Sequence, residues 1–481
     1  MNPLKLLKPI GALLLFFGMV FIPPMIMAWF EADGMFNVFA QSLLITWLVG
    51  GICFLIPGDQ QEFSRPDGFL IVTLIWLVSS LCAALPFLLG HHVADFADAV
   101  FETVSGITTT GATVMHDLTE YPVSIQFYHQ FLQFFGGLGI IVIASAIMPL
   151  MKIGGLHLYH AEMPGPAKDQ KIMPRLRQTA IVLCKIYVVL NILCMIGFKL
   201  SGLTWFQAIC ESFATISTGG FSLHADSFGH YSRAAQCCAM LFMLLGGINF
   251  QLHYVFFKFK KIGIYWENFE SRYFILTVMI LSLGIFIALL NLKVYSTANT
   301  PFLNSLFMVL SIITTTGFVN VDFAHWPSAL PEIMVLIGMI GGCAGSTTGG
   351  VKLIRVLVSL KQCTLVLKQV LHPLAVFRMT FSGYEIRDDM IRHVMAFMML
   401  FFYTYIILFI LLLMLGLDMP TAFAALSACI SNVGASIGSV SSSYHQLDSA
   451  TKLLLSFAML IGRIEIMTIF VILMPTYWRD I

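Results

Sequence analysis

The chain has 481 residues, of which 58% are hydrophobic and only 11% are charged. A soluble domain carries roughly 25% charged residues, so this composition excludes a soluble globular protein and predicts a polytopic membrane protein. The formal net charge of +1 indicates no particular partner, and no nucleic-acid partner is expected. The ten cysteines are scattered without a Cys-x-x-Cys pair, which is typical of small buried hydrophobic residues rather than of a metal site.

Ten segments are long and apolar enough to span a bilayer, since a spanning helix needs about 20 mostly apolar residues. The first two precede a pattern that the other eight share, in which the spans come in pairs. In chain order the predicted spans are Ile10–Phe30, Phe36–Pro57, Phe69–Leu89, Ser124–Met151, Thr179–Leu200, Ala234–Phe257, Tyr273–Leu292, Ile333–Leu360, Val394–Leu415 and Lys452–Met474.

Each of the four pairs encloses a segment that is too short to span, followed by a run rich in glycine and hydroxyl side chains. The short segments are Ala94–Gly106, Trp205–Ser217, Pro301–Thr314 and Pro420–Ser431. The glycines at matched places in the four runs are Gly111, Gly220, Gly317 and Gly434. Helix start signals precede the short segments, such as the capping-box pattern from Thr204 to Gln207 and Asp418 before Pro420. Each unit therefore predicts a span, a half-helix, an extended loop and a second span.

These repeats divide the chain into two N-terminal helices followed by four related units. The predicted boundaries are 1–64 for the two helices and 65–177, 178–270, 271–390 and 391–481 for the units. One glycine run alone is ordinarily a turn between helices, but four at matched places indicate pseudosymmetry. Non-helical backbone at membrane depth is tolerated only where protein buries it or where it lines an aqueous cavity. The predicted fold is therefore an all-α membrane protein whose four loops surround one pore.

The distribution of basic residues predicts the orientation of the chain. With Met1 inside, ten spans return the C-terminus to the inside, and most of the 26 lysines and arginines then lie on inner segments or their edges. The outer side holds only Lys199, Arg233, Lys293 and Lys452. The positive-inside rule supports this topology, which makes both termini cytoplasmic and brings the four glycine runs in from the outer face.

The chemistry of the runs suits an alkali cation. Backbone carbonyls and threonine hydroxyls replace the hydration shell of such an ion without a fixed charge that would trap it. Half-helices whose C-terminal ends face the cavity add a negative dipole potential. None of the runs contains a carboxylate or a lysine, which argues against anion conduction and against a divalent-cation site built from carboxylates.

On these runs and this topology the chain resembles the Trk/Ktr/HKT superfamily of potassium transporters, and most of all its bacterial TrkH/TrkG branch. The resemblance covers nearly the whole chain and implies a filter in which each unit contributes a glycine and flanking carbonyls. The potassium-binding residues so implied are Thr109, Thr110, Gly111, Gly219, Gly220, Thr315, Thr316, Gly317, Asn432, Val433 and Gly434. Serine replaces the first glycine in sodium-preferring plant relatives, so Gly111 implies potassium. The fourth run departs from the threonine-rich pattern.

The second span of the third unit contains too many glycines for a continuous helix, at roughly 1 kcal/mol each relative to alanine. We expect it to break in mid-membrane into a polar loop that acts as a gate. A tightly packed helix contact through small residues is the alternative, but the resemblance implies an intramembrane loop that obstructs the pore. The predicted gating residues are Gly341, Gly342, Gly345, Ser346, Thr347, Thr348, Gly349 and Gly350.

Arg463 lies in the middle of the last predicted span, where a guanidinium is costly unless it is paired or faces a cavity. Pairing with Glu465 is disfavoured, because residues two apart on a helix do not face each other. We expect Arg463 to lie near the broken loop, as an electrostatic barrier or as an anchor for the closed state. Lys352 adds to the same positive field, or is simply an inner-face residue.

The basic inner loops suit anionic lipid headgroups or a cytoplasmic partner. The chain has no Gly-x-Gly-x-x-Gly motif and no P-loop, so nucleotide gating would need another polypeptide. The resemblance implies a cytoplasmic TrkA-type subunit that binds nucleotides, a homodimer, the bacterial inner membrane, and either channel-like conduction or symport. No organic cofactor and no enzymatic activity are expected. The alternative function is a secondary carrier working by alternating access, which four similarly oriented repeats disfavour. A scaffold without transport is a third, weaker possibility.

Overall fold

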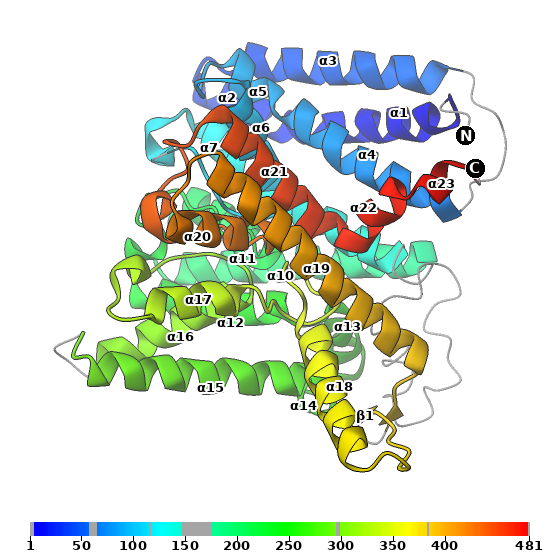
Figure 1. The fold of residues 1–481 in the computed structure, drawn as a ribbon. Coiled ribbons are helices and arrows are strands. Elements are labelled where there is room, and N and C mark those ends of the chain that lie inside the picture. The colour runs from blue at the N-terminus through cyan, green and yellow to red at the C-terminus, as the bar shows by residue number, and fades with distance from the viewer. Residues whose placement is uncertain are drawn as a thin grey trace.

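The structure is a computed structural model that describes residues 4–56, 65–115, 117–146, 176–294, 299–381 and 384–479. The regular secondary structure of the described part is helical apart from a short antiparallel hairpin of β1 (Thr380–Phe381) and β2 (Tyr384–Glu385). Most of the predicted inner loop between the first and second units lies outside the described residues. Both ends of the chain lie at the same end of the helical bundle (Figure 1), as an even number of membrane crossings requires.

The first 146 residues form the two N-terminal helices and the first unit. Their helices are α1 (Leu4–Gly18), η1 (Met19–Phe21), α2 (Ile22–Glu31), α3 (Phe36–Leu55), α4 (Arg65–Ala83), α5 (Leu85–Leu89), α6 (Phe96–Ile107), η2 (Leu118–Glu120) and α7 (Val123–Ala146). Pro23 and Pro24 lie in the first turn of α2, where the missing proline N–H costs no hydrogen bond within the helix.

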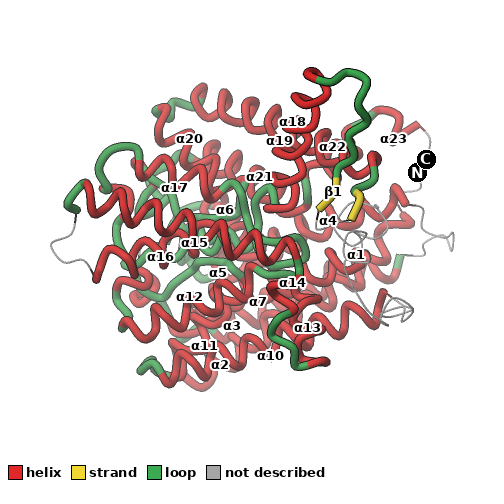
Figure 2. The backbone as a smooth tube through the Cα atoms, turned by 90° about the horizontal axis from the view of Figure 1, so that it is seen from below, coloured by secondary structure: helices red, strands yellow, loops and turns green. Residues whose placement is uncertain are grey.

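The remaining helices form the other three units. The second unit has α10 (Leu176–Leu200), α11 (Trp205–Ser217), η4 (Ser227–Gly229), α12 (Arg233–Gly247), α13 (Phe250–Phe259) and α14 (Ile264–Glu267). The third has α15 (Phe269–Asn291), α16 (Asn299–Ile313), η5 (Phe323–His325), α17 (Leu330–Gly338) and α18 (Leu353–Leu371). The fourth has α19 (Asp388–Met414), α20 (Met419–Ile430), η6 (Gly438–Val440), α21 (Ser449–Ile464), α22 (Ile466–Leu473) and α23 (Pro475–Arg479). Figure 2 shows loop segments running among these helices.

Among the described residues, six helices are long and apolar enough to cross a membrane, or up to eight if each of two bent pairs is one span. Ten spans were predicted, of which only Ile333–Leu360 was expected to break, and the structure bends two others as well. The two predicted spans outside this set correspond to the 24-residue helix α7 and to α17 with α18, which are separated by the glycine-rich stretch.

The predicted span Ala234–Phe257 is wrong as a continuous helix, because α12 and α13 meet at an angle of 101°. The bend falls after the pair Gly246 and Gly247, and the Asn249 side chain accepts a hydrogen bond from the backbone N–H of Gln251, which caps the new helix. The carbonyl of Gly247, freed by the bend, accepts a hydrogen bond from the backbone N–H of Cys343 at 2.9 Å. The third unit therefore supplies the hydrogen-bond donor that the Gly247 carbonyl lacks where the helix is interrupted.

The last predicted span, Lys452–Met474, also bends, by 104° between α21 and α22. Glu465 at the junction has φ of +73°, which no continuous right-handed helix allows. One turn earlier, a Cβ added to Gly462 would lie 2.0 Å from the carbonyl oxygen of Ile430. The close approach of α20 therefore requires glycine at this position.

The four half-helices α6, α11, α16 and α20 each end at one of the glycine runs. The predicted capping box is confirmed, since the Thr204 side chain accepts from the N–H of Gln207 and the Gln207 side chain accepts from the N–H of Thr204. Asp418 caps α20 in the predicted place by accepting from the N–H of Thr421. Caps of this kind satisfy the free N–H groups at a helix start, which fixes where each half-helix begins.

A buried ion pair joins the first unit to the fourth. Lys452 Nζ in α21 lies 2.5 Å from Asp98 Oδ1 in α6, and their side chains are only 5% and 3% exposed. Removing one partner of such a pair leaves an uncompensated charge and costs about 3–5 kcal/mol. We expect Lys452→Met to lower the unfolding temperature of the detergent-solubilised protein clearly, and Asp98→Asn in the same chain to restore most of it. A double variant no more stable than Lys452→Met would contradict this coupling.

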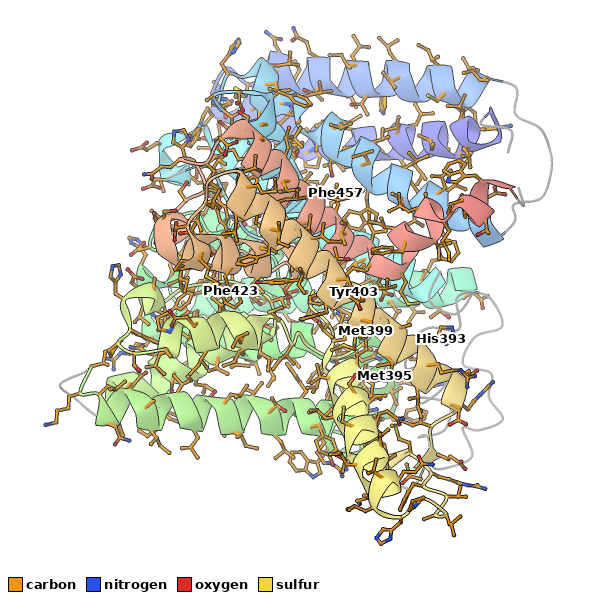
Figure 3. The ribbon with its side chains drawn as sticks, in the orientation of Figure 1. His393, Met395, Met399, Tyr403, Phe423 and Phe457 are labelled. Carbon is orange, nitrogen blue, oxygen red and sulfur yellow. The ribbon has the colours of Figure 1, made fainter. Side chains whose placement is uncertain are left out.

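The outer surface of the helical bundle is apolar, as lipid contact requires. Met399 and Tyr403 on α19 are 52% and 53% exposed, and Phe457 on α21 is 47% exposed. Figure 3 shows these residues along neighbouring helices on one face of the bundle. The hydroxyl-rich runs, in contrast, are buried at the centre.

Candidate functional site

The four glycines form a closed ring. A Cβ added to any one of them would lie between 1.8 and 2.3 Å from a backbone carbonyl oxygen of the next unit. That oxygen belongs in every case to the residue directly before the next unit's glycine. The pairs, glycine first, are Gly111 with Gly219, Gly220 with Thr316, Gly317 with Val433, and Gly434 with Thr110. The order runs from the first unit through the fourth and back to the first, so the runs surround one axis.

The backbone takes the same conformation in all four runs. The ring glycines Gly111, Gly220, Gly317 and Gly434 have φ of +83°, +81°, +81° and +75°. Two residues earlier, Thr109, Thr218, Thr315 and Asn432 have φ of +52°, +54°, +53° and +54°. The backbone N–H directly before each glycine donates at 2.8 Å to a carbonyl five residues earlier. The fourth run departs from the others in sequence but not in geometry.

Hydroxyl side chains brace the first and third runs in the same way. Thr108 and Thr110 share a hydrogen bond between their Oγ1 atoms at 2.7 Å, and Thr314 and Thr316 share one at 2.8 Å. The fourth run is braced by an amide instead of a hydroxyl pair. Asn432 Nδ2 donates to Thr110 Oγ1 at 2.9 Å. That bond joins the fourth run to the first, so it helps to close the ring.

An open cavity of about 410 Å³ lies on one side of the ring. Its walls come from all four units, and its filter residues are the ring glycines and those that follow them, such as Thr113, Ser222 and Asn320. Each half-helix ends on the side of its glycine run that is away from this cavity. The cavity therefore opens toward the surface at which the half-helices begin. We call it the entrance cavity; it is large enough for several waters, because one water occupies roughly 30 Å³ in the liquid.

His224 lines this entrance, and its ring stacks on that of His230 with centroids 3.8 Å apart. Burial, followed by the charge of His230, lowers the pKa of His224 below its ordinary value of 6.5, against the opposing pull of Asp226 and Asp117. His224 therefore gains a positive charge less readily than a free imidazole, and does so only on acidification.

We expect cation uptake to fall roughly two- to fivefold as the outer pH drops from 7 to 5. A protonated histidine on the cavity wall, with water between it and the ion, repels a cation by about 1 kcal/mol or less. His224→Gln should flatten the pH profile of uptake. His445→Gln, which alters an exposed histidine outside the cavity lining, is the matched control. A profile unchanged in His224→Gln would contradict the assignment.

Residues 339–352, between α17 and α18, form a non-helical loop beneath the ring. Gly341, Gly345 and Gly350 have φ of +77°, +74° and +70°, conformations that side chains disfavour. The bend of the second unit holds the loop, since the N–H of Phe250 donates to the carbonyl of Gly345 at 3.0 Å. Glu270 in α15 accepts from the N–H of Ala344 at 2.6 Å.

The centre of this loop touches the filter runs of three units. Thr347 Oγ1 donates to the carbonyl of Ile216 in the second unit at 3.0 Å, and the N–H of Gly349 donates to Thr315 Oγ1 in the third at 2.7 Å. A Cβ added to Gly349 would lie 2.3 Å from the carbonyl oxygen of Ser431 in the fourth unit. The contacted residues of the runs precede the ring glycines in the sequence. The loop therefore meets the runs on the side opposite the open cavity.

The rest of the predicted gating loop braces these contacts. Ser346 and Thr348 share a hydrogen bond between their hydroxyls at 2.7 Å, and the N–H of Gly342 donates to Thr348 Oγ1 at 3.2 Å. Lys352 Nζ donates to the carbonyl of Thr348 and to its Oγ1 atom. The ammonium group is therefore held against the loop rather than free in the cytoplasmic layer.

Arg463 lies against the same loop. Its Nη1 donates to the carbonyl of Thr347 at 2.9 Å, and the side chain is buried. Within the described residues, Nε and Nη2 have no hydrogen-bond partner. A smaller cavity of about 70 Å³ is lined by Arg463, Lys352 and Arg355 and by the carboxylate of Glu465, so three basic residues and one acidic residue face it.

Glu465 pairs with Arg355, not with Arg463. Arg355 Nη2 lies 2.9 Å from Glu465 Oε1, and the guanidinium carbon lies 3.9 Å from the centre of the Phe397 ring. This pair joins α18, which follows the loop, to the junction between α21 and α22. Arg463 thereby keeps an unneutralised charge beside the loop.

Gln133 in α7 is a filter contact that the sequence analysis missed. Its Nε2 donates to the carbonyl of Gly219 at 2.6 Å, and its Oε1 accepts from the N–H of Phe221 at 3.2 Å. The signal was present, since Gln126, His129, Gln130 and Gln133 recur at helical spacing in a mostly apolar helix and all are buried. Such a polar stripe inside a membrane protein indicates polar partners, and for Gln133 that partner is the second filter run.

Comparison with known proteins agrees with this geometry. Residues 34–479 match the TrkH family, described as cation transport proteins. The Trk system potassium uptake protein TrkH of Vibrio parahaemolyticus is 39% identical over 481 residues, covering 99% of both chains. The TrkH protein of Escherichia coli K12 is 36% identical over 474 residues, covering 98% of both. The TrkG protein of the same strain is 35% identical over 479 residues, covering 98% of this chain and 97% of TrkG.

The architecture agrees as well. The crystal structure of the potassium transporter TrkH from Vibrio parahaemolyticus superposes with a TM-score of 0.92, at 36% identity and with both chains fully covered. The predicted all-α polytopic membrane fold is thereby confirmed. With its ring of four glycine loops, the chain belongs to the TrkH family of cation transport proteins.

Proposed function

We propose that this chain is the potassium-translocating subunit of a Trk-type potassium uptake system. The observation that carries the proposal is the closed ring in which each filter glycine adjoins a backbone carbonyl of the next unit. Four units with one backbone conformation bring equivalent carbonyls to a single axis. Its relatives are named potassium uptake proteins, which supports potassium as the transported ion.

The ring acts by exchanging water for carbonyl oxygens as the ion enters. Glycine is needed because a side chain at any of the four positions would overlap the neighbouring carbonyl. The half-helices end at the ring, so the negative ends of their dipoles lie next to it and favour a cation there. A filter built only from neutral oxygens binds the ion weakly enough to release it.

The loop of residues 339–352 serves as the gate in this proposal, and the described conformation is a closed one. It touches the filter runs of three units on the inner side, and Arg463 places a positive charge at the same level. Conduction requires this loop to leave the axis. The bend between α12 and α13 and the end of α21 hold the loop, so movements of these helices would release it.

We also propose that a cytoplasmic nucleotide-binding subunit of the TrkA type controls the gate, and that the chain forms a homodimer in the bacterial inner membrane with both termini cytoplasmic. The relatives are named as components of a Trk system. Lys258, Lys260 and Lys261 are exposed at the end of α13, which carries the bend that holds the loop. This basic end suits an acidic surface on a cytoplasmic partner.

Uptake of potassium into proteoliposomes tests the proposal, with the purified chain alone and then with the cytoplasmic subunit and ATP. The expected result is potassium entry with which an excess of sodium competes poorly. No potassium entry under either condition would contradict the proposal. Entry that occurs only against the flow of a second ion or proton would favour a secondary carrier instead.

A further inference from the structure

Two buried carboxylates lie behind the filter and take no part in the transport described above. Glu102 in α6 and Glu211 in α11 each lie nine residues before the ring glycine of their unit, and both are 0% exposed. The same position holds Met308 in the third unit and Ala425 in the fourth. A buried carboxylate is costly unless its hydrogen bonds are satisfied, so its presence in two of four units calls for a physical reason.

Both carboxylates hold the outgoing arm of their own filter loop, in the same register. Glu102 accepts from Thr113 Oγ1 at 2.7 Å and from the N–H of Val114 at 2.8 Å. Glu211 accepts from Ser222 Oγ at 2.9 Å and from the N–H of Leu223 at 3.0 Å. The bonded residues are the second and third after Gly111 and Gly220. Each carboxylate thus ties its loop, just beyond the ring, to the rigid half-helix before it.

The third partner of each carboxylate comes from a neighbouring segment. Glu102 is bonded to His129 Nε2 in α7, and the His129 ring stacks on Phe221 with centroids 3.6 Å apart. Phe221 directly follows the ring glycine of the second unit. Glu211 accepts from the hydroxyl of Tyr231 at 2.9 Å. The two networks therefore form a continuous support behind the first and second loops.

The other two units use neutral contacts. In the third, Ser311 Oγ donates to the carbonyl of Phe318 at 2.7 Å, and in the fourth the Tyr444 hydroxyl donates to the carbonyl of Gly434 at 3.2 Å. Each glutamate, in contrast, gathers three contacts at one point behind its loop, more than a single hydroxyl donor provides. The support of the ring is therefore stiffer on the side of the first and second units.

We propose that Glu102 and Glu211 are positioning residues that set the width of the ion site, and thereby its preference for potassium over sodium. The inference rests on the proposed function. Held outward by the carboxylates, the first two loops keep their carbonyls at the spacing that suits the larger ion. Released, the loops relax toward the axis and accommodate the smaller ion as well.

Glu102→Gln and Glu211→Gln test this in proteoliposomes by the ratio of potassium to sodium uptake, measured with the cytoplasmic subunit present. Glutamine keeps the shape of the side chain but replaces one acceptor oxygen by an NH₂ group, which cannot accept a hydrogen bond from the loop. We expect the ratio to fall roughly tenfold in each variant while potassium uptake itself persists, since the loss of one buried hydrogen bond to the loop is worth about one power of ten. Glu120→Gln, at an exposed outer position, should leave the ratio unchanged.

A ratio equal to that of the unaltered protein in variants that still take up potassium would overturn the inference and leave the proposed function intact. No potassium uptake by the unaltered protein would instead refute the proposed function. If the glutamine variants do not fold, as judged by size-exclusion chromatography, Thr113→Val and Tyr231→Phe decide the question. Each removes one donor and keeps the carboxylate, and an unchanged ratio in both would overturn the inference.

Discussion

Gly220→Ala is expected to reduce potassium uptake to the level of empty vesicles. The added methyl group would lie 1.8 Å from the carbonyl oxygen of Thr316, far inside van der Waals contact. That atom is backbone and belongs to the ring, so the overlap is relieved only by displacing an ion ligand. Gly220 also has φ of +81°, where an alanine costs about 1–2 kcal/mol. Substitution therefore damages both the residue and its neighbour in the third unit.

Gly284→Ala in α15 is the matched control, because nothing lies within 4 Å of the added Cβ. Alanine in a helix interior is favoured over glycine by about 1 kcal/mol, so this variant should transport normally and be slightly more stable. Uptake is measured with potassium in proteoliposomes, and folding by size-exclusion chromatography in detergent. Full potassium uptake by a folded Gly220→Ala protein would show that the ring is not the ion path.

Arg463→Met is expected to raise potassium uptake by the chain in the absence of its cytoplasmic subunit. The variant removes the hydrogen bond from Nη1 to the carbonyl of Thr347 and the positive charge beside the loop. A hydrogen bond to a charged group contributes about 1.5–3 kcal/mol. Its loss shifts the balance between closed and open loop by roughly ten- to a hundredfold, at 1.4 kcal/mol per factor of ten. The loop keeps its other contacts with the filter runs, so the shift is partial.

Arg463→Met should not unfold the protein, because it removes an incompletely paired buried charge, which is costly to desolvate, and strands no opposite charge. Arg392→Gln, on the exposed side of α19, removes a charge without touching the loop and should leave uptake unchanged. Arg355→Met is unsuitable as a control, since it would strand Glu465 without its partner. Uptake by Arg463→Met that equals or falls below that of the unaltered chain would contradict a gating role for this residue.

The half-helices were predictable because their signals are local. Thr204 and Gln207 fit a capping box in the sequence, and the structure has that box at the start of α11. The four glycines were predictable for a related reason, since a run of hydroxyl residues ending in glycine carries its own backbone requirement. Even the fourth run, whose Asn432 replaces threonine, follows the same φ pattern.

The two bends in the spanning helices were harder to predict. Ala234–Phe257 and Lys452–Met474 each have the length and composition of one continuous span, and composition alone cannot show that a helix turns by about a right angle. At the first bend another unit takes up a freed backbone group, since the N–H of Cys343 donates to the carbonyl of Gly247. That partner cannot be read from the sequence near the bend.

The sequence by itself determined that this is a polytopic membrane protein, where its half-helices lie, and which four glycines occupy the ring. These features depend on apolar run length, helix caps and positive φ, which are properties of a few neighbouring residues. Only the tertiary structure decided which carbonyl adjoins which glycine, that Glu465 pairs with Arg355, and that Glu102 and Glu211 hold the filter loops. The physical reason is that these contacts join separate segments, in some cases a hundred residues or more apart, and contacts across such distances leave no periodic trace in the chain.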